Sequence, residues 1–194
     1  MTDLLYGIMD SRNAASADHG TVRILSEFYP DNILATRDVK SCHKPYVAIS
    51  RLLQKNYLER TGGRHPDIQY RITLKGKCRI MCQEFNIRFL CLCIMCEAYC
   101  LHRSQIIHGC ETFYVIQDIK DIFGEIYEYK SITNSANILH RRGFTRRRTR
   151  DTIEICDKTM KRLEAHQGTI NELHKWIAGV QGMLNRKALE SLSA

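Results

Sequence analysis

Apolar residues recur every three or four positions in two segments near the start of the chain, which is the spacing of one buried helix face. The residues that follow this spacing are Val22, Leu25 and Phe28, and then Ile49, Leu52 and Leu53. Pro45 suits a first helical position, because its missing N–H would have no partner there, and Asn56 suits a left-handed residue that ends a helix. The pattern predicts helices over residues 21–29 and 45–56.

Two short β-like runs follow the second helix, at residues 57–60 and 69–73. The TGGRHPD segment between them is rich in turn residues, which predicts a loop that joins two strands into a hairpin. Ile33 and Leu34 suit a short strand that pairs with this hairpin, and a polar corner, CHK, precedes the second helix. Helix, corner, helix and hairpin in this order are typical of a winged helix-turn-helix, which places its second helix in the DNA major groove.

A strongly apolar segment follows Gly76. Its apolar residues are Ile80, Met81, Phe85, Ile87, Phe89, Leu90, Leu92, Ile94, Met95, Tyr99 and Leu101. A helix that is apolar nearly all round is buried, either in a domain core or against a partner subunit. Residues 113–129 carry an apolar stripe with acidic residues on the other side, which predicts an amphipathic helix, although residues 112–116 alone suit a strand.

From Asp151 onward, apolar positions follow alternating steps of three and four, which predicts one long helix with a coiled-coil or helix-pair seam. The seam and the residues that widen it include Ile153, Cys156, Met160, Leu163, Ile170, Leu173, Ile177, Val180 and Leu184. We expect a dimer contact there, because a helix of this length would overhang a compact domain. The alternative is a long helix that folds back on its own domain.

The predicted fold is therefore mainly α with a small β-hairpin wing. It has an N-terminal winged helix-turn-helix over residues 1–80 and a cysteine-rich helical core or dimerisation region over residues 81–130. A basic linker and the long coiled-coil-like helix occupy residues 131–194. A chain of 194 residues is long enough for one good-sized domain or for a small domain with an oligomerisation element.

The positive charge of the chain, +8 in total, lies in two blocks. Residues 1–80 carry 13 Lys and Arg against 8 Asp and Glu, and residues 131–194 carry 12 against 6. Residues 81–130 are mildly acidic, with 4 against 7. This partition favours two DNA-facing surfaces around a packing core.

Three short motifs lie between Ser50 and Gly76. They are Ser50-Arg51-Leu52, Lys55-Asn56-Tyr57-Leu58-Glu59-Arg60 and Tyr70-Arg71-Ile72-Thr73-Leu74-Lys75-Gly76. The motifs resemble those of winged-helix transcription regulators of the MarR and PadR type, in which a serine-arginine-leucine helix runs into a K-G-L-I-x-R strand and a wing that ends in Y-x-L-T-x-K-G. Asn56 stands where that family usually has glycine. The resemblance covers about residues 20–80 and implies a DNA-binding transcription regulator.

The outward face of the second helix and the hairpin carry the residues that we expect to bind double-stranded DNA. They are Tyr46, Ser50, Arg51, Gln54, Lys55, Arg60, Arg64, His65, Arg71 and Lys75. Arg51 suits guanine and Gln54 suits adenine, whereas Arg64 and His65 suit the adjacent minor groove or the phosphates. Lys77 adds to the positive charge that DNA phosphates require.

The sequence thus favours a sequence-specific regulator that acts as a homodimer on an inverted repeat. Two alternatives stay open. One is a plasmid or viral replication or partition protein that binds DNA. The other is a winged-helix subunit that binds protein within a larger complex, since a fold alone does not define a function.

Nine cysteines and no visible signal peptide indicate a reducing cytoplasm and free thiols. Cys93 and Cys96 have the C-x-x-C spacing of a metal site, and Cys100 follows on the same helix face. The segment lacks the turn residues of a zinc knuckle, so we interpret these three as core residues rather than as metal ligands or a redox switch. Cys42 and Cys156 also occupy predicted core positions.

Six arginines lie between residues 141 and 150, and they have three interpretations. The arginines are Arg141, Arg142, Arg146, Arg147, Arg148 and Arg150. They form a solvated linker, a second arm that contacts phosphates, or part of a second helix-turn-helix over residues 131–153. A cluster this dense repels itself, which favours an anionic partner.

No motif in the sequence indicates an enzyme or a cofactor. A nucleophile elbow, a phosphate-binding glycine loop and an H-E-x-x-H zinc motif are all missing from the sequence. The longest apolar stretch, residues 89–101, is interrupted by Glu97 and is too short to span a bilayer. We therefore expect a cytoplasmic protein that does not enter a membrane.

Overall fold

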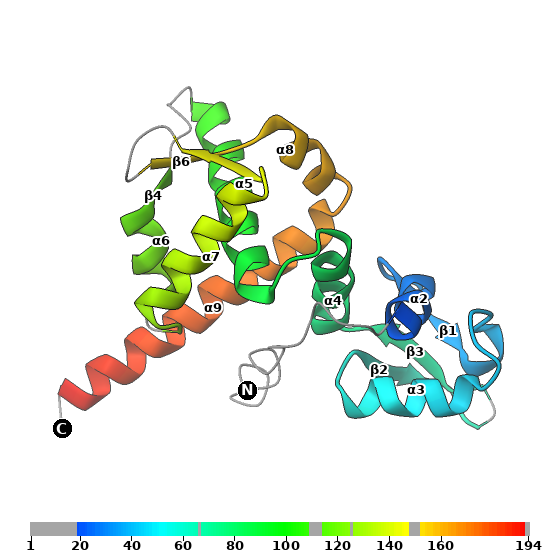
Figure 1. Cartoon of the computed structure of the whole chain (residues 1–194). Helices are drawn as coiled ribbons and strands as arrows, with labels where there is room; N and C mark the ends of the chain where they lie inside the picture. Colours follow the sequence, from blue (N-terminus) through cyan, green and yellow to red (C-terminus); the bar gives the residue numbers. More distant parts are fainter. Residues whose placement is uncertain (1–18, 66, 109–113, 125, 148–151, 193–194) are drawn as a thin grey trace. The chain divides into compact units, whose positions relative to one another are not determined.

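The structure is a computed structural model of the chain. It describes all residues except 1–18, 66, 109–113, 125, 148–151 and 193–194, and it leaves out the side chains of 105–108, 114–116, 118 and 184–192. The chain divides into two compact units, unit 1 (residues 1–92) and unit 2 (residues 93–194). Each unit combines helices with a small antiparallel sheet (Figure 1), which confirms the mainly α prediction with a small β part.

Unit 1 has the order helix, strand, short 3-10 helix, helix, hairpin, helix. The elements are α2 (His19–Phe28), β1 (Leu34–Ala35), η1 (Thr36–Asp38), α3 (Pro45–Gln54), β2 (Leu58–Gly62), β3 (Gln69–Ile72) and α4 (Leu74–Glu84). The sheet order is β1-β3-β2, with Leu34 opposite Tyr70 and Leu58 opposite Ile72. The predicted hairpin and its short pairing strand are confirmed.

An apolar cluster joins the helices of unit 1 to the sheet. It contains Ile24, Leu25, Phe28, Val39, Ile49, Leu52, Leu58, Tyr70, Ile72 and Ile80. The inward residues that helical spacing predicts for α2 and α3 belong to this cluster or pack against it. Because Ile49 and Leu52 are buried, the opposite side of α3 faces outward.

Unit 2 also consists of helices and a three-stranded sheet. Its elements are α5 (Phe89–His108), β4 (Tyr114–Val115), α6 (Ile116–Phe123), α7 (Tyr129–Arg141), β5 (Thr145–Arg147), β6 (Thr152–Ile155), α8 (Asp157–Glu164) and α9 (Gln167–Leu192). The boundary between the units falls inside α5. The sheet is antiparallel in the order β4-β6-β5.

The apolar segment after Gly76 forms α4 and α5. Every residue from 89 to 99 is buried, as the all-round apolar pattern predicts. The segment predicted as one helix over residues 113–129 instead starts with β4, and α6 ends at Phe123. The strand alternative is therefore correct at residues 114 and 115, because Tyr114 pairs with Ile153 of β6.

The basic segment expected as a linker contains α7 and β5, and the helix expected from Asp151 starts with a strand. Burial alternates along β6, where Ile153 and Ile155 are buried and their neighbours are half-buried. This period of two is the signature of a strand, and antiparallel pairing with β5 satisfies its backbone. Two helices, α8 and α9, follow in place of one.

The stripe on α9 that was predicted as a dimer seam is covered by the protein's own chain. Ile170, Leu173, Ile177 and Val180 are all buried, and the side chain of Leu184 lies outside the description. The coiled-coil prediction is thus not confirmed. In its described part, the helix matches the alternative of a helix packed on its own domain.

Candidate nucleic-acid interface

The outward face of α3 is a surface of polar and aromatic side chains. Tyr46 is 59% exposed, and Ser50, Arg51, Gln54 and Lys55 are exposed as well. The side chains of Tyr46, Ser50, Arg51 and Gln54 make no hydrogen bond or ion pair with another residue in the described parts of the chain. The five side chains predicted for the helix are therefore all exposed, and the donors and acceptors of Tyr46, Ser50, Arg51 and Gln54 remain available.

A carboxylate on α2 fixes the corner that leads into α3. The Glu27 carboxylate accepts hydrogen bonds from the backbone N–H groups of Lys40 and Ser41, at 2.9 and 2.8 Å. Arg23 donates to the carbonyl of Ser41 from the same helix. Burial raises the pKa of Glu27, but these hydrogen bonds outweigh it and lower the pKa below its usual range. The corner is thus held by charge-assisted bonds that the sequence pattern did not predict.

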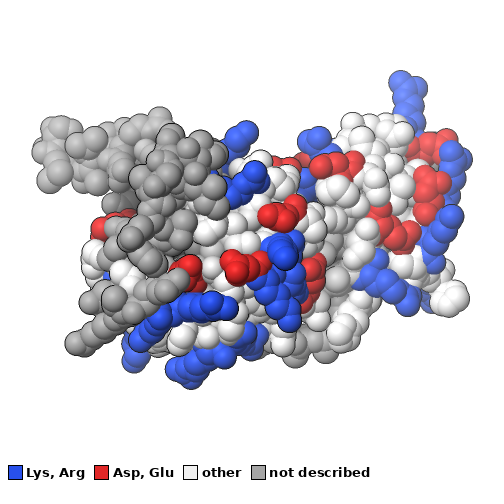
Figure 2. All heavy atoms as spheres, turned by 90° about the horizontal axis from the view of Figure 1, so that it is seen from above, with Lys and Arg blue, Asp and Glu red and all other residues white. Residues whose placement is uncertain are grey.

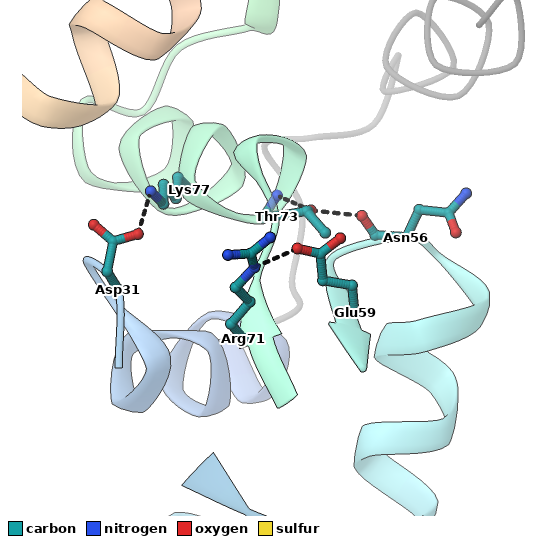
Figure 3. A network of polar contacts seen from close by, with 7 residues as sticks. Asp31, Asn56, Glu59, Arg71, Thr73 and Lys77 are labelled. Atoms are coloured by element: carbon teal, nitrogen blue, oxygen red, sulfur yellow. Dashed lines mark hydrogen bonds and ion pairs between the residues drawn. The ribbon is translucent and has the colours of Figure 1, made fainter. Parts of the chain in front are cut away.

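The other end of α3 is tied to the hairpin and to α4 (Figure 3). Asn56 has a φ of 56°, which confirms the left-handed end of the helix. Its carbonyl accepts a hydrogen bond from Oγ1 of Thr73 at 2.7 Å. Oγ1 of Thr73 also accepts from the N–H of Gly76 at 3.2 Å and so caps α4. One hydroxyl therefore sets the position of the helix end relative to the strand that follows the loop.

The hairpin β2–β3 carries exposed basic residues on its first strand and its loop. Arg60, Arg64 and His65 are exposed. The register shifts between Arg60 and Gly62, and Gly63 has a φ of 81°. A bulge with a left-handed glycine turns the loop sharply, which leaves Arg64 and His65 near its tip.

Three other basic residues predicted to bind DNA contact side chains within unit 1. Arg71 forms an ion pair with Glu59 across the hairpin at 2.5 Å (Figure 3). Lys77 is buried and pairs with Asp31 at 2.7 Å. The ammonium of Lys75 lies 5.5 Å from the centre of the Tyr57 ring, and burial lowers its pKa. Arg71 and Lys77 therefore supply less free positive charge than the sequence suggested, because carboxylates pair with them.

The basic residues are distributed among acidic ones. On the face that Figure 2 shows, Lys and Arg stand in several separate groups with Asp and Glu between them. Arg37 and Asp67, for example, form an exposed ion pair at 2.9 Å beside the hairpin loop. A binding surface therefore has to be defined locally, by the face of one helix and the hairpin beside it.

Four of the six arginines of the basic tract lie in described elements of unit 2. Arg141, Arg142, Arg146 and Arg147 are exposed, at the end of α7 and on β5. Arg148 and Arg150 lie outside the described residues. The tract is thus not an extended arm in its described part but belongs to a helix end and a strand.

The cysteines are mostly packed in the protein interior. Cys93 and Cys96 are fully buried, and Cys100 is half-buried with a pKa raised to about 11, chiefly by burial. Burial also raises the pKa of Cys82 to about 12. Cys42 and Cys156 are half-buried. Among the residues with described positions, no three His, Cys, Asp or Glu side chains group as a metal site.

Comparisons with family models, with curated proteins and with solved structures gave no match. Over the described residues, no single helix is long and apolar enough to cross a membrane. Helices α4 and α5, which are bent by 93° at the break between them, pass that test only as a pair. The interpretation of the site therefore depends on its own geometry.

Proposed function

We propose that unit 1 is a winged helix-turn-helix that binds double-stranded DNA, and that the protein is a sequence-specific transcription regulator. The observation that supports this most is the exposed face of α3. Arg51 and Gln54 lie one turn apart there, with their functional groups unused by the described chain. The buried side of the same helix holds it firmly against the sheet.

The chemistry of this face matches the edges of base pairs. An arginine can donate two hydrogen bonds to O6 and N7 of guanine, and a glutamine can bond N6 and N7 of adenine. Arg60, Arg64 and His65 on the hairpin would contact phosphates or the adjacent minor groove. Arg71 and Lys77 are assigned no such role, because carboxylates already pair with them.

The proposal is tested by selecting duplexes that bind the full chain from a random pool, followed by affinity measurements. Arg51→Ala should weaken binding to the selected sequence about tenfold to a hundredfold, because one bidentate base contact is worth about 1–3 kcal/mol. Binding to unrelated DNA should change little. Arg88→Ala removes another exposed arginine of unit 1 and serves as the matched control.

Two results would overturn the proposal. The first is a pool in which no sequence becomes enriched. The second is an equal loss of specific and non-specific binding for Arg51→Ala, which would reduce this residue to a phosphate contact. The homodimer stays a prediction, and sedimentation of the full chain at twice its mass would confirm it.

A further inference from the structure

Unit 2 repeats the architecture of unit 1. Both units have a helix, a short strand, a short helical segment, a second helix, a hairpin and a further helix, in this order. Their sheets have the same topology, since β1-β3-β2 in unit 1 corresponds to β4-β6-β5 in unit 2. By this order α7 corresponds to α3, and the hairpin β5–β6 corresponds to β2–β3.

The correspondence continues at the level of single residues where the helix ends. Asn56 and Gly143 both have a positive φ, of 56° and 72°. Their N–H groups bond to the carbonyls of Leu53 and His140, at 2.9 and 3.0 Å. Each residue therefore ends its helix in the left-handed conformation at the same position.

The aromatic residue after this turn is held identically in both units. The N–H of Tyr57 bonds to the carbonyl of Leu52 at 2.9 Å, and the N–H of Phe144 bonds to that of Leu139 at 3.0 Å. The two leucines are buried at 2% and 0% exposure. Both helices thus turn into the first hairpin strand through the same bonds.

The hairpins close against the following helix in the same way. Leu58 pairs with Ile72, and Thr145 pairs with Ile155, at the corresponding register. The residue after the second strand then bonds back to the aromatic residue, and each of the two bonds is 3.0 Å long. They run from Thr73 N–H to the carbonyl of Tyr57, and from Cys156 N–H to the carbonyl of Phe144.

The helix pair α6 and α7 is fixed by contacts of Tyr129, the first residue of α7. Its hydroxyl donates to Oε1 of Gln117 at 2.9 Å, and the ammonium of Lys120 lies 3.9 Å from the centre of its ring. Ile132 and Leu139 of α7 are fully buried. The opposite side of α7 is therefore presented outward, as in α3.

The outward side of α7 and its hairpin is basic and polar. The exposed residues there include Lys130, Ser131, Asn134, His140, Arg141, Arg142, Arg146 and Arg147. The guanidinium of Arg147 donates to Oδ1 of Asn137, so a side chain of the hairpin contacts a side chain of the helix. Helix and hairpin thus form one continuous surface within unit 2.

From this repeat and its charge, we propose that α7 and the hairpin β5–β6 form a second surface that binds double-stranded DNA. The inference goes beyond the function proposed for unit 1, and it rests on that proposal for the occupant of the surface. Arg141 and Arg146 contact phosphates, whose charge is complementary to theirs. Arg146 lies opposite Glu154 in the hairpin, but unlike Arg71 it forms no ion pair with a described residue. Asn134 is placed to bond an adenine edge, which the amide of asparagine suits. One chain then contacts a duplex through two modules.

The test compares two double variants of the full chain on the duplex selected for the wild type. Arg141→Ala with Arg146→Ala should lower the slope of log affinity against log salt by about two, because each phosphate contact contributes about 0.9. The length of DNA that the protein protects from cleavage should shorten as well. Lys158→Ala with Lys161→Ala removes the same charge from exposed positions of α8 and should change neither.

The effect of the substitutions on folding can be separated from their effect on charge by a further double variant. Arg141→Lys with Arg146→Lys should restore the salt slope, and the circular dichroism of all variants should match the wild type. Equal behaviour of the α7 and α8 variants would overturn the second surface. A preference of the α7 surface for single-stranded RNA or for an acidic protein over the duplex would overturn it too.

The two proposals fail in different ways. If Arg51→Ala binds like the wild type while the α7 variant loses its salt slope, the assignment of α3 is wrong and the second surface stands. If Arg51→Ala loses sequence preference while the α7 and α8 variants behave alike, unit 1 alone binds DNA.

Discussion

The carboxylate of Glu97 on α5 accepts a hydrogen bond from Nδ1 of His174 on α9, at 2.9 Å. Only 6% of the Glu97 side chain is exposed, against 48% for His174. Burial raises the pKa of Glu97, and the bond and charge of His174 only partly oppose this. Two helices of unit 2 are therefore joined by a carboxylate that the interior makes harder to ionise.

A pH dependence of stability follows from Glu97. Because the pKa of Glu97 is raised on folding, the folded chain keeps a proton on this carboxyl at pH values where the unfolded chain has lost it. The protonated carboxyl therefore stabilises the fold fully below about pH 4.5, and this stabilisation is lost as the pH rises through the raised pKa. Glu97→Gln keeps an acceptor but cannot ionise. The free energy of unfolding of the wild type should therefore decrease relative to Glu97→Gln above pH 4.5. A difference that stays constant from pH 4 to pH 8 in denaturant titrations would contradict this.

Thr73→Val should destabilise unit 1. The substitution removes the hydroxyl that bonds to both Asn56 and Gly76 but keeps the shape of the side chain. Loss of such a helix cap costs about 1–2 kcal/mol. Denaturant unfolding would measure this cost, and Thr73→Ser, which keeps the hydroxyl, should stay within a few tenths of a kcal/mol of the wild type.

Two glycine substitutions should have opposite effects. A Cβ atom at Gly76 would lie 2.4 Å from the backbone oxygen of Tyr57, so Gly76→Ala should cost about 1–3 kcal/mol in unfolding free energy. A Cβ atom at Gly179, inside α9, would meet nothing within 4 Å. Gly179→Ala should therefore stabilise the protein by about 0.5–1 kcal/mol. Thermal unfolding would measure both effects, and a Gly76→Ala variant that melts no lower than the wild type would contradict the predicted clash with Tyr57.

The cysteines should react with alkylating reagents in an order set by burial. Cys82, Cys91, Cys93 and Cys96 should resist modification in the folded protein, because they are buried and the pKa of Cys82 is raised to about 12. The half-buried Cys42 and Cys156 should react before this buried group, and mass spectrometry of timed samples would give the order. Rapid modification of the buried group without unfolding would show that this interior opens.

The elements of unit 1 could be predicted because their signals are local. A proline at the first helical position, a left-handed Asn56 and the turn-rich loop each specify the backbone over a few residues. The face of α3 followed from helical spacing alone. The free charge could not be predicted, since Lys77 is paired with Asp31, 46 positions away.

The elements of unit 2 were harder to predict, because the three-four spacing of a helix and the alternation of a strand overlap in its sequence. Ile153, Cys156 and Met160 satisfy the three-four spacing of a helix by coincidence, whereas tertiary pairing with β5 makes a strand of the first part. The four-residue strand is too short to reveal its alternation. A signal was present in Leu139 and Phe144, which repeat the spacing of Leu52 and Tyr57 around a left-handed residue.

The hairpins of the two units carry their opposed charges in reverse order. Glu59 on the first strand faces Arg71 in unit 1, whereas Arg146 on the first strand faces Glu154 in unit 2. Exchange of strands between the repeats would set Glu59 against Glu154 and Arg146 against Arg71, and like charges directly opposite destabilise a sheet. In a newly made chain with two similar hairpins, this difference in charge order therefore disfavours pairing of a strand of one hairpin with a strand of the other.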